Sequence, residues 1–299
     1  MLVLLTVVLT VLGAARGEEP KRLGVGLYAP SAPFEGPEAR LAFVTALAEH
    51  LQERAGRPVV GRVFARSADL AAAVRKGEVQ LVVVDAPNAA SLGAGFEILG
   101  VAVRSVGGAT SVPWELVASD AAHDLRDLRG KTIAVPAAAG HEAAFLHNAM
   151  LENEVAPGYF GKITAAPDAL SAAAAVSVGR ADAAIVPGGR ALPAGVHLVA
   201  TLRDLPWPTV ALAPGLDDAT RRALTAALPG FRATGVFSRF DPPGANAAPF
   251  TFVLLPAPRR GPMAVPAGTR LEVKGVLAGR TFAIEPSDLT PLIEAPERR

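Results

Sequence analysis

The stretch AAAVRKGEVQLVVVDA, residues 71–86, decides the fold class of this chain. Its first part is typical of an Ala- and Val-rich helix that Gly77 ends, and residues 79–85 form a nearly continuous apolar strand. A strand without polar alternation is covered on both faces, as in parallel sheets between helices. We therefore predict an α/β fold of doubly wound, mostly parallel sheets.

The same pattern returns in the second half of the chain, at an offset of 102 residues. Ala73-Val74-x-x-Gly77-x-Val79-Gln80-x-x-x-Val84 aligns with Ala175-Val176-x-x-Gly179-x-Ala181-Asp182-x-x-x-Val186. In both segments a helix ends at glycine and an apolar strand follows after one residue. Chance or the general regularity of α/β chains would also produce such an echo. Two duplicated lobes are the more specific interpretation.

The first half is predicted to be a β-α-β-α-β unit. We expect strands at residues 22–28, 58–65, 79–85 and 96–104. Helices are expected at 37–55, ending at Gly56, and at 67–77, with Ser67 as N-cap. Residues 105–113, SVGGATSVP, are small and suit a hinge.

A second unit of the same kind follows the hinge. Strands are expected at 131–136, 162–165 and 181–187, and helices at 140–151 and 168–178. The chain is then expected to return through strand-like segments at 196–202 and 209–213 and a helix at 216–228. The domain prediction is a signal peptide at 1–17, lobe 1 at 18–112 completed by about 204–250, lobe 2 at 113–203, and a β-rich C-terminal extension at 251–299.

The N-terminus has the pattern of an export signal. Residues 1–12, MLVLLTVVLTVL, are an uncharged apolar run, and the small residues Gly13, Ala15 and Gly17 place cleavage before Arg16 or Glu18. The run is shorter than the roughly 20 residues that span a bilayer. No Lys or Arg precedes the run, which indicates a start codon further upstream. An uncleaved anchor or a buried first helix is the alternative. We expect a periplasmic or secreted protein.

The composition excludes several function classes. Lys and Arg number 29 against 28 Asp and Glu, a formal net charge of +1 that gives no electrostatic basis for a nucleic-acid partner. The chain has no cysteine, which excludes disulfides, thiolate nucleophiles, Cys-ligated zinc and a lipid-modified N-terminal Cys. Hydrophobic residues make up 51% and charged residues 19%, as expected for a packed globular protein.

Catalytic and cofactor motifs fail on their spacing. His141-Glu142 begins like a zinc-protease helix, but position 145 is Phe where the second His is needed. Gly24-x-Gly26-x-x-Ala29 matches a dinucleotide fingerprint, yet both glycines lie inside the expected strand and no acidic residue ends the next strand. We therefore predict a chain that is not an enzyme and has no cofactor, metal or catalytic residues.

Several passages resemble the phosphate/phosphonate-binding family of periplasmic solute-binding proteins of bacterial ABC transporters. AAAVRKGEVQLVVVDA (71–86) resembles the first lobe of that family. DLRGKTIAVP (127–136) and GYFGKITAAPDALSAAAAVSVGRADAAIVP (158–187) resemble its second lobe, and GLDDATRRALTAAL (215–228) its return segment. The likeness covers roughly residues 22–230. It implies a two-lobed type II periplasmic-binding fold, with two crossovers between the lobes and the ligand in the cleft.

Ligands of doubly wound sheets lie at the carboxyl ends of the parallel strands. The predicted ligand-binding residues there are Tyr28, Ser31, Asp85, Asn88, Thr110, Ser111, Ala138, Ala139, Gly140 and His141.

Each predicted contact has a chemical role. Backbone N–H groups of residues 138–141 suit an oxyanion, because a helix start leaves them unpaired. Tyr28 supplies a ring wall, and Ser31, Thr110 and Ser111 supply hydroxyl donors. Asp85 is either a cleft acceptor or only a cap of its turn. Trp114 and Trp207 are expected to pack at the lobe crossovers.

The chain departs from the family at the expected anion loop. Phosphonate binders of the family open this helix with a Ser-Thr-Ser-Gly turn, whereas Ala137-Ala138-Ala139-Gly140 stands here. Backbone donors remain, but each lost charge-assisted hydrogen bond from a hydroxyl is worth about 1.5–3 kcal/mol. The loss predicts weaker binding of a phosphate or phosphonate.

We expect a monomer that closes two lobes over a small anionic, phosphate- or phosphonate-like solute and presents it to an ABC permease in the inner membrane. One alternative is a degenerate binding-protein-like sensor or protein-interaction module without a transport role. Another is an enzyme on the same two-lobed scaffold. A collapsed cleft would favour the sensor, and inward polar groups would favour transport.

Overall fold

The computed structural model describes residues 22–89, 92, 95–152 and 154–243. All of them belong to the first of two compact units, which comprises residues 1–257. The predicted signal peptide and the predicted β-rich C-terminal extension lie outside the described residues. Among the described residues, no helix combines the length and the apolar character that a membrane span needs.

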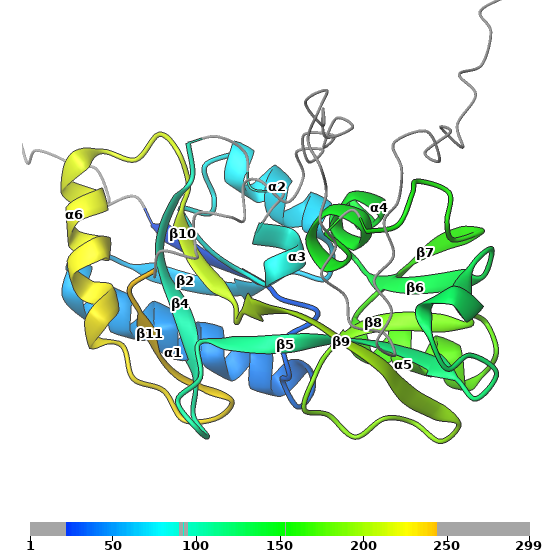
Figure 1. The fold of residues 1–299 in the computed structure, drawn as a ribbon. Helices are drawn as coiled ribbons and strands as arrows, with labels where there is room; N and C mark the ends of the chain where they lie inside the picture. The colour runs from blue at the N-terminus through cyan, green and yellow to red at the C-terminus, as the bar shows by residue number, and fades with distance from the viewer. Residues whose placement is uncertain (1–21, 90–91, 93–94, 153, 244–299) are drawn as a thin grey trace, which may run out of the picture. The chain divides into compact units, whose positions relative to one another are not determined.

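The described residues form two mixed β-sheets, with strand orders β11-β4-β10-β3-β1-β2 and β7-β6-β8-β5-β9 (Figure 1). We call the six-stranded sheet with its helices lobe 1, and the five-stranded sheet with its helices lobe 2. The strands are β1 Leu23–Tyr28, β2 Val59–Val63, β3 Leu81–Val84, β4 Glu97–Arg104, β5 Ser111–Ser119, β6 Thr132–Pro136, β7 Lys162–Ala166, β8 Ala183–Pro187, β9 Val196–Pro206, β10 Thr209–Leu212 and β11 Phe237–Asp241.

The helices cover these sheets. Lobe 1 has α1 Gly36–Ala55, α2 Ser67–Arg75, α3 Ala86–Ala89, α6 Asp218–Ala227 and the 3₁₀ turn η3 Leu228–Gly230. Lobe 2 has the 3₁₀ turn η1 Leu125–Leu128, α4 Glu142–Ala144, the π-helix η2 Phe145–Met150 and α5 Ala169–Ser177. Ser67 was expected to be an N-cap, but it is the first helical residue of α2, and Arg66 precedes it in extended backbone.

The strands of the predicted β-α-β units are parallel, as expected. β1 pairs in parallel with β2 and β3, and β6 pairs in parallel with β7 and β8. β10 and β11 in lobe 1 and β5 in lobe 2 run antiparallel to their neighbours. The sheets are therefore mixed: β5 and β10 are antiparallel strands that follow the two crossovers, and β11 forms one edge of the lobe 1 sheet.

β5 corrects the prediction of a hinge at 105–113. Ser111 already begins this nine-residue strand. Pro113, which lacks an N–H donor, hid the strand in the sequence, and the β5–β9 register shifts between Pro113 and Glu115. The connection between β4 and β5 is thus the shorter segment 105–110.

The two crossovers between the lobes lie side by side, because β5 pairs with β9 from Ser111 opposite Pro206 to Ser119 opposite Val196. The chain returns to lobe 1 between β9 and β10, through Trp207. Trp114 and Trp207 are only 2% and 8% exposed, and the prediction that both pack at the crossovers is confirmed.

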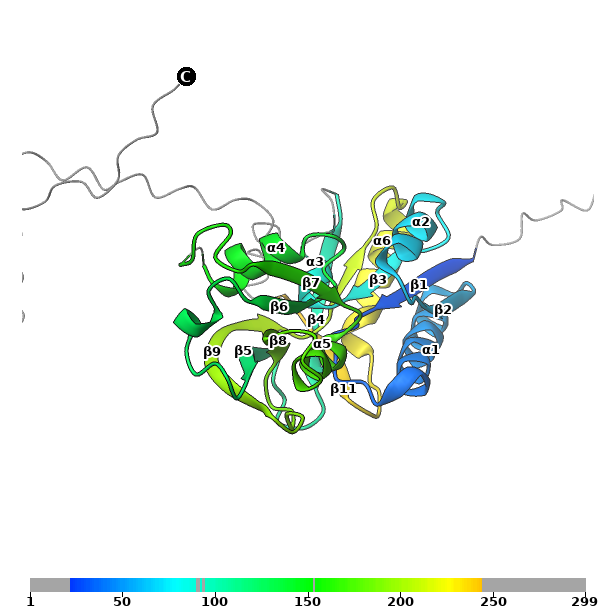
Figure 2. The ribbon, with the colours of Figure 1, turned by 90° about the vertical axis from the view of Figure 1, so that its right-hand side faces the viewer.

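The apolar run of β3 is explained by cores on both faces of its sheet. Leu81 and Val83 lie in the main core with α1, while Val82 and Val84 lie in a second core with Leu70 of α2. Figure 2 shows α1 and α2 on opposite sides of β1, the parallel neighbour of β3.

The repeated segments 73–84 and 175–186 have the same structure where their helices end. Gly77 and Gly179 have φ angles of 68° and 69°, in the left-handed region. Gly77 donates its N–H to the Val74 carbonyl (2.9 Å), and Gly179 donates to Val176 (3.0 Å). Each helix therefore ends in the same glycine turn.

The echo extends to a side-chain contact at the start of the neighbouring strand. Gln80 Oε1 accepts a hydrogen bond from the Gly24 N–H (2.7 Å), and Asp182 Oδ2 accepts one from the Thr132 N–H (2.8 Å). The two side chains occupy equivalent positions in the two lobes, which supports the interpretation of duplicated lobes.

Candidate functional site

Asp85 organises the lobe 1 side of the site. It follows β3 directly and is 3% exposed. Its Oδ2 accepts the Ser31 N–H (2.7 Å), and its Oδ1 accepts the Asn88 side-chain amide (2.7 Å). Burial raises the pKa of Asp85 to about 6, and the hydrogen bonds from Asn88 and Ser31 offset part of that rise. These contacts fit the alternative in which Asp85 caps its turn.

Tyr28, at the carboxyl end of β1, presents a phenol that is protonated at neutral pH. Burial raises the pKa of Tyr28, and the negative charge of Asp85 raises it further, while hydrogen bonding to Ser67 lowers it. The negative charge of Glu142, in lobe 2, also raises it. The hydroxyl is therefore a hydrogen-bond donor within electrostatic range of both acidic groups.

Asn88 joins the two lobes. Its amide nitrogen donates to the Ala137 carbonyl of lobe 2 at 3.1 Å, in addition to its bond with Asp85. Ala137 directly precedes the predicted anion loop. The structure thus brings the lobe 1 residues Asp85 and Asn88 next to the loop 138–141.

The anion loop of lobe 2 already holds an oxygen. The N–H groups of Ala138 and Gly140 both donate to Glu142 Oε1, at 2.9 Å and 3.2 Å. Ala139 and Gly140 have φ angles of 54° and 87°, and this left-handed turn aims the two N–H groups at one point. Two of the N–H groups that were predicted to hold an oxyanion therefore converge on one oxygen, which the chain's own Glu142 carboxylate supplies.

Sequence reasoning missed Glu142. It also placed the helix start at Gly140, whereas α4 begins at Glu142 and His141 holds the N-cap position without a side-chain cap bond. The backbone at Gly140 is left-handed and not helical. The signal in the sequence was the spacing of Glu142, two residues after the glycine, where its side chain folds back onto the loop.

Thr110 and Ser111 lie at the start of β5, at the crossover. The Thr110 carbonyl accepts the Trp207 N–H at 2.9 Å, and Ser111 is paired opposite Pro206. His141 is exposed. The described part of the chain shows no hydrogen bond that joins Thr110 or Ser111 to Asp85 or to the loop 138–141.

The space between the lobes beside Asp85 is nearly filled. A cavity of about 10 Å³ is left there. Its lining comes from both lobes and both crossovers: Ser31, Ala32, Asp85, Ala86, Val112, Trp114, Pro187, Pro206, Trp207 and Pro208. A cavity of this size holds one water molecule at most. A solute can enter this region only after the lobes move apart.

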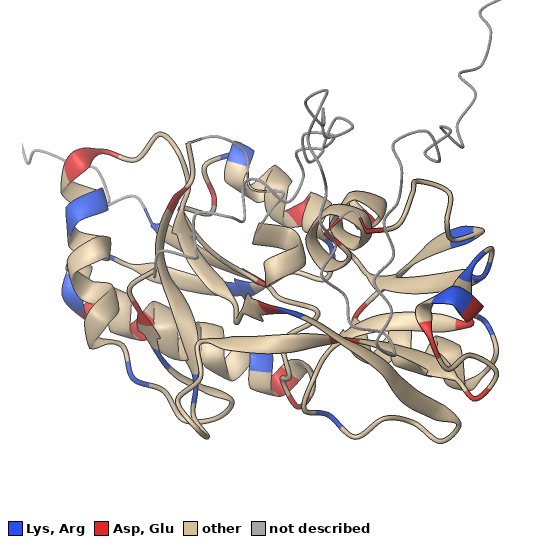
Figure 3. Ribbon diagram, viewed as in Figure 1, with Lys and Arg blue, Asp and Glu red and all other residues tan. Residues whose placement is uncertain are grey.

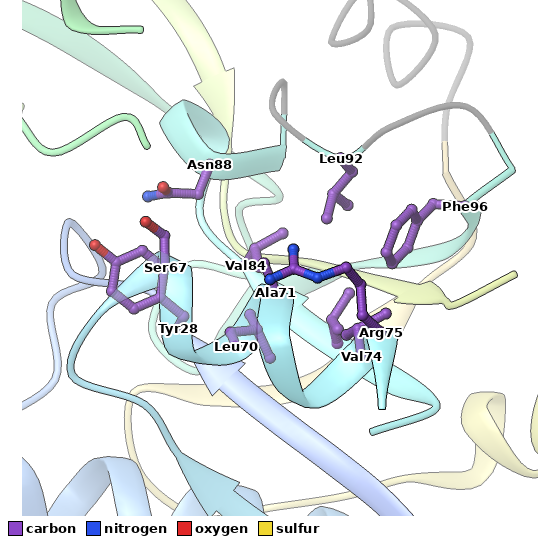
Figure 4. Close-up of a pocket in the computed structure, with 11 residues that line it drawn as sticks. Tyr28, Ser67, Leu70, Ala71, Val74, Arg75, Val84, Asn88, Leu92 and Phe96 are labelled. Atoms are coloured by element: carbon purple, nitrogen blue, oxygen red, sulfur yellow. The ribbon is translucent and has the colours of Figure 1, made fainter. Parts of the chain in front are cut away.

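A larger cavity, of about 210 Å³, opens in lobe 1 beside Tyr28 (Figure 4). It lies between α2, β3 and α3, and it is lined by Tyr28, Ser67, Leu70, Ala71, Val74, Arg75, Val82, Val84, Asn88, Leu92 and Phe96. No pattern in the sequence indicated this cavity.

Charged residues of both signs are interspersed over both lobes (Figure 3). Near the crossovers, the loop after β8 carries the half-buried Arg190. Burial lowers its pKa, Asp168 opposes that effect, and the positive charges of Arg104 and Arg40 lower the pKa further. Three basic side chains therefore lie within electrostatic range of one another. In the described residues, no group of three or more His, Asp or Glu side chains could hold a metal ion.

Solved structures with the same fold come from several bacteria. A Xanthomonas citri protein bound to ATP shares 16% identity, covering 78% of this chain and 95% of its own, with a TM-score of 0.61. The binding-protein component of an ABC phosphonate transporter from Pseudomonas aeruginosa shares 14% sequence identity. The alignment covers 78% of this chain and 85% of that protein, with a TM-score of 0.59.

A third structure is a Prochlorococcus marinus protein in complex with methylphosphonate. It shares 11% identity, covering 76% of this chain and 94% of its own, with a TM-score of 0.56. These similarities show that the fold is the two-lobed type II periplasmic-binding fold predicted from the sequence.

Family membership comes from the sequence match. No curated protein matches the chain. The family described as the periplasmic substrate-binding protein of the phosphonate ABC transporter matches residues 31–242. That match spans both lobes apart from β1, which ends at Tyr28 before the match begins. The chain therefore belongs to the family of periplasmic substrate-binding proteins of phosphonate ABC transporters.

Proposed function

We propose that this chain captures a small oxyanion of the phosphonate or phosphate class between its lobes and delivers it to an ABC permease. The observation that carries the proposal is the convergence of the Ala138 and Gly140 N–H groups on one carboxylate oxygen of Glu142. A backbone that coordinates a carboxylate oxygen also suits an oxygen of a phosphonate, which is a stronger acceptor with more charge.

Binding requires an exchange of oxygens on this loop. The lobes first separate about the crossovers, because the space between them is nearly filled. The solute oxygen then replaces Glu142 on the two N–H groups. Tyr28 adds a donor from lobe 1, and Arg190 with Arg104 supplies positive potential near the crossovers. Renewed closure retains the solute.

We further propose that the chain is exported and acts as a monomer without catalysis and without a nucleic-acid partner. The apolar run at residues 1–12 supports export, and the net charge of +1 supports the absence of a nucleic-acid partner.

The test is to measure anion binding while Glu142 is varied. Wild type, Glu142→Gln and Glu142→Ala are titrated calorimetrically with methylphosphonate, phosphate and sulfate. We expect Glu142→Ala to bind methylphosphonate at least about tenfold tighter than wild type, because releasing one charge-assisted contact is worth about 1.5–3 kcal/mol. Glu142→Gln, a weaker neutral acceptor, falls between them. Glu154→Ala, which removes an exposed carboxylate of the same lobe, is the control and leaves the affinity unchanged.

A second candidate function is the degenerate sensor or protein-interaction module. The 10 Å³ cavity between the lobes and the occupied anion loop favour it. If wild type and Glu142→Ala are both folded by circular dichroism and neither binds any anion of the panel, the receptor proposal is wrong and the module is supported.

A further inference from the structure

Three arginines lie together near the crossovers, and the proposed function uses only the potential that their charges produce. Arg40 lies near the start of α1, Arg104 is the last residue of β4, and Arg190 lies in the loop after β8 of lobe 2. All three are half-buried, and the charges of Arg104 and Arg40 both act on Arg190. Like charges at this range repel one another, so their assembly costs stability unless an anion lies among them.

An aromatic cluster holds the two lobe 1 arginines in place. The Arg104 guanidinium carbon lies 5.4 Å from the centroid of the Trp207 ring. Trp207 packs on Phe237 with ring centroids 5.7 Å apart, and Phe237 packs on Phe43 of α1 with centroids 6.1 Å apart. Phe43 follows Arg40 by about one helical turn. One packed unit therefore positions both cations.

The loop that carries Arg190 is attached to the first crossover, because the Gly188 N–H donates to the Pro113 carbonyl of β5 at 2.7 Å. Figures 1 and 2 both show this loop, the connection after β4 and the start of α1 on the lower side of the described residues. Both views show α4, which follows the anion loop, on the upper side. The arginine cluster is thus separate from the loop 138–142.

The guanidinium groups of the cluster have donors to spare. Within the part of the chain that the structure describes, Arg40, Arg104 and Arg190 form no ion pair and no side-chain hydrogen bond, and the buried Arg40 Nε has no partner. The acidic group whose charge acts on Arg190 is Asp168, and its Oδ1 already accepts the Ser171 N–H at the start of α5. Buried charges are normally paired, so these donors are available to an anion from solution.

We infer that Arg40, Arg104 and Arg190 form a second anion site, which takes a small multivalent oxyanion of the pyrophosphate class. A planar guanidinium binds two oxygens of a phosphate at once, and three guanidinium groups match an anion with several oxygens and more than one charge. Because Arg190 belongs to lobe 2 and the other two arginines to lobe 1, the bound anion bridges the lobes. It stabilises the arrangement in which the lobes are in contact.

The test is a calorimetric titration of the full chain with pyrophosphate at low ionic strength, where screening is weak. Wild type is compared with Arg40→Gln and Arg190→Gln. The controls are Arg222→Gln and Arg180→Gln, which remove exposed arginines of lobe 1 and lobe 2. We expect each cluster variant to bind pyrophosphate at least about tenfold more weakly than wild type, because each loses charge-assisted hydrogen bonds. Both controls bind pyrophosphate as wild type does.

Circular dichroism checks that each variant is folded. Arg190→Lys, which keeps the charge but loses the planar fork, replaces Arg190→Gln in the comparison if the latter does not fold, and it too weakens binding. The inference is wrong if pyrophosphate does not bind folded wild type, if the cluster variants and the controls bind it equally well, or if sulfate binds as tightly as pyrophosphate. If Glu142→Ala strengthens pyrophosphate binding while the arginine variants leave it unchanged, the anion binds at the loop 138–142. That result overturns the inference and supports the proposed function.

Discussion

The Asp85 carboxyl group is buried, and hydrogen bonds to both of its oxygens hold it in place. Its two oxygens bind the Ser31 N–H and the Asn88 amide, one from the loop after β1 and one from α3. The group thereby links the loop after β1 to α3. Burial is the largest influence on its pKa, which lies at about 6 compared with an ordinary value of 3.8.

This pKa makes stability depend on pH. A carboxyl whose folded pKa is raised stabilises the fold fully below pH 3.8, and that contribution is lost as pH rises through about 6. The shift corresponds to about 3 kcal/mol over the whole window. We expect the free energy of unfolding by urea to fall between pH 4 and pH 7, and Asp85→Asn to flatten that fall. Asp204→Asn, at an exposed position, is the control; equal pH profiles for all three proteins would contradict the assignment.

The two glycines of β1 are explained by how closely the chain packs against this strand. A Cβ atom at Gly24 would overlap the Glu78 carbonyl oxygen, and one at Gly26 would approach Leu70 and Phe64 too closely. Both glycines exist because α2 and the turn that follows it press directly on the strand. The fingerprint-like spacing is therefore accounted for by packing.

We expect Gly24→Ala to destabilise the fold by roughly 1–3 kcal/mol or more, because the overlapping atom belongs to backbone and cannot turn aside. The measurement is the midpoint of thermal unfolding. Gly230→Ala serves as the comparison, since its Cβ would meet only the His50 ring at an ordinary 3.4 Å. If Gly24→Ala and Gly230→Ala unfold at the same midpoint, the strand can accommodate a Cβ atom beside the Glu78 carbonyl and the prediction is wrong.

Elements with regular periodicity and end signals were predictable from the sequence, and elements shaped by long-range contacts were not. α1 ends at Gly56 as expected, and Asp168 and Asp217 cap α5 and α6. β5 escaped because Pro113 interrupts its pattern and its pairing with β9 is distant in sequence. The π-helix at residues 145–150 escaped because its hydrogen-bond spacing has no simple sequence signal.

The candidate site was predictable in place but not in contents. The rule that ligands lie at strand carboxyl ends predicted a site around Tyr28, Asp85 and the loop 138–140, and the Asn88 amide links Asp85 to Ala137, directly before that loop. The capture of that loop by Glu142 depends on how one side chain folds back onto backbone donors. The lobe 1 cavity depends on how α2 packs on β3. Neither the Glu142 contact nor the cavity can be predicted from the local periodicity of the sequence.

One core runs through both lobes of the described residues. Its main cluster contains Leu27 of β1 and Ile133 of β6, and Trp114 on the β5 crossover packs edge-to-face on Phe145 with ring centroids 5.3 Å apart. A shared core couples the lobes in unfolding, because neither can lose it alone.

We expect a single cooperative transition in urea. The chain has two tryptophans, both at the crossovers, so their fluorescence reports that region, while circular dichroism reports the helices of both lobes. The two midpoints should coincide, and Trp114→Ala should lower both equally, at a cost of about 3–5 kcal/mol. Separate midpoints in the wild-type protein would show that the lobes unfold independently.

The contact of Glu142 with the anion loop sets a threshold for what the protein can recognise. A tethered carboxylate competes with any dissolved anion at an effective concentration of about millimolar or more. The apparent affinity of a solute is its intrinsic affinity multiplied by the fraction of molecules in which the loop has been vacated. A dissolved carboxylate gains nothing by replacing Glu142, because it offers the loop N–H groups the same kind of acceptor that Glu142 already provides. The same contact that weakens the binding of every anion therefore selects for anions that have a stronger hydrogen-bonding head group or that make additional contacts elsewhere in the site.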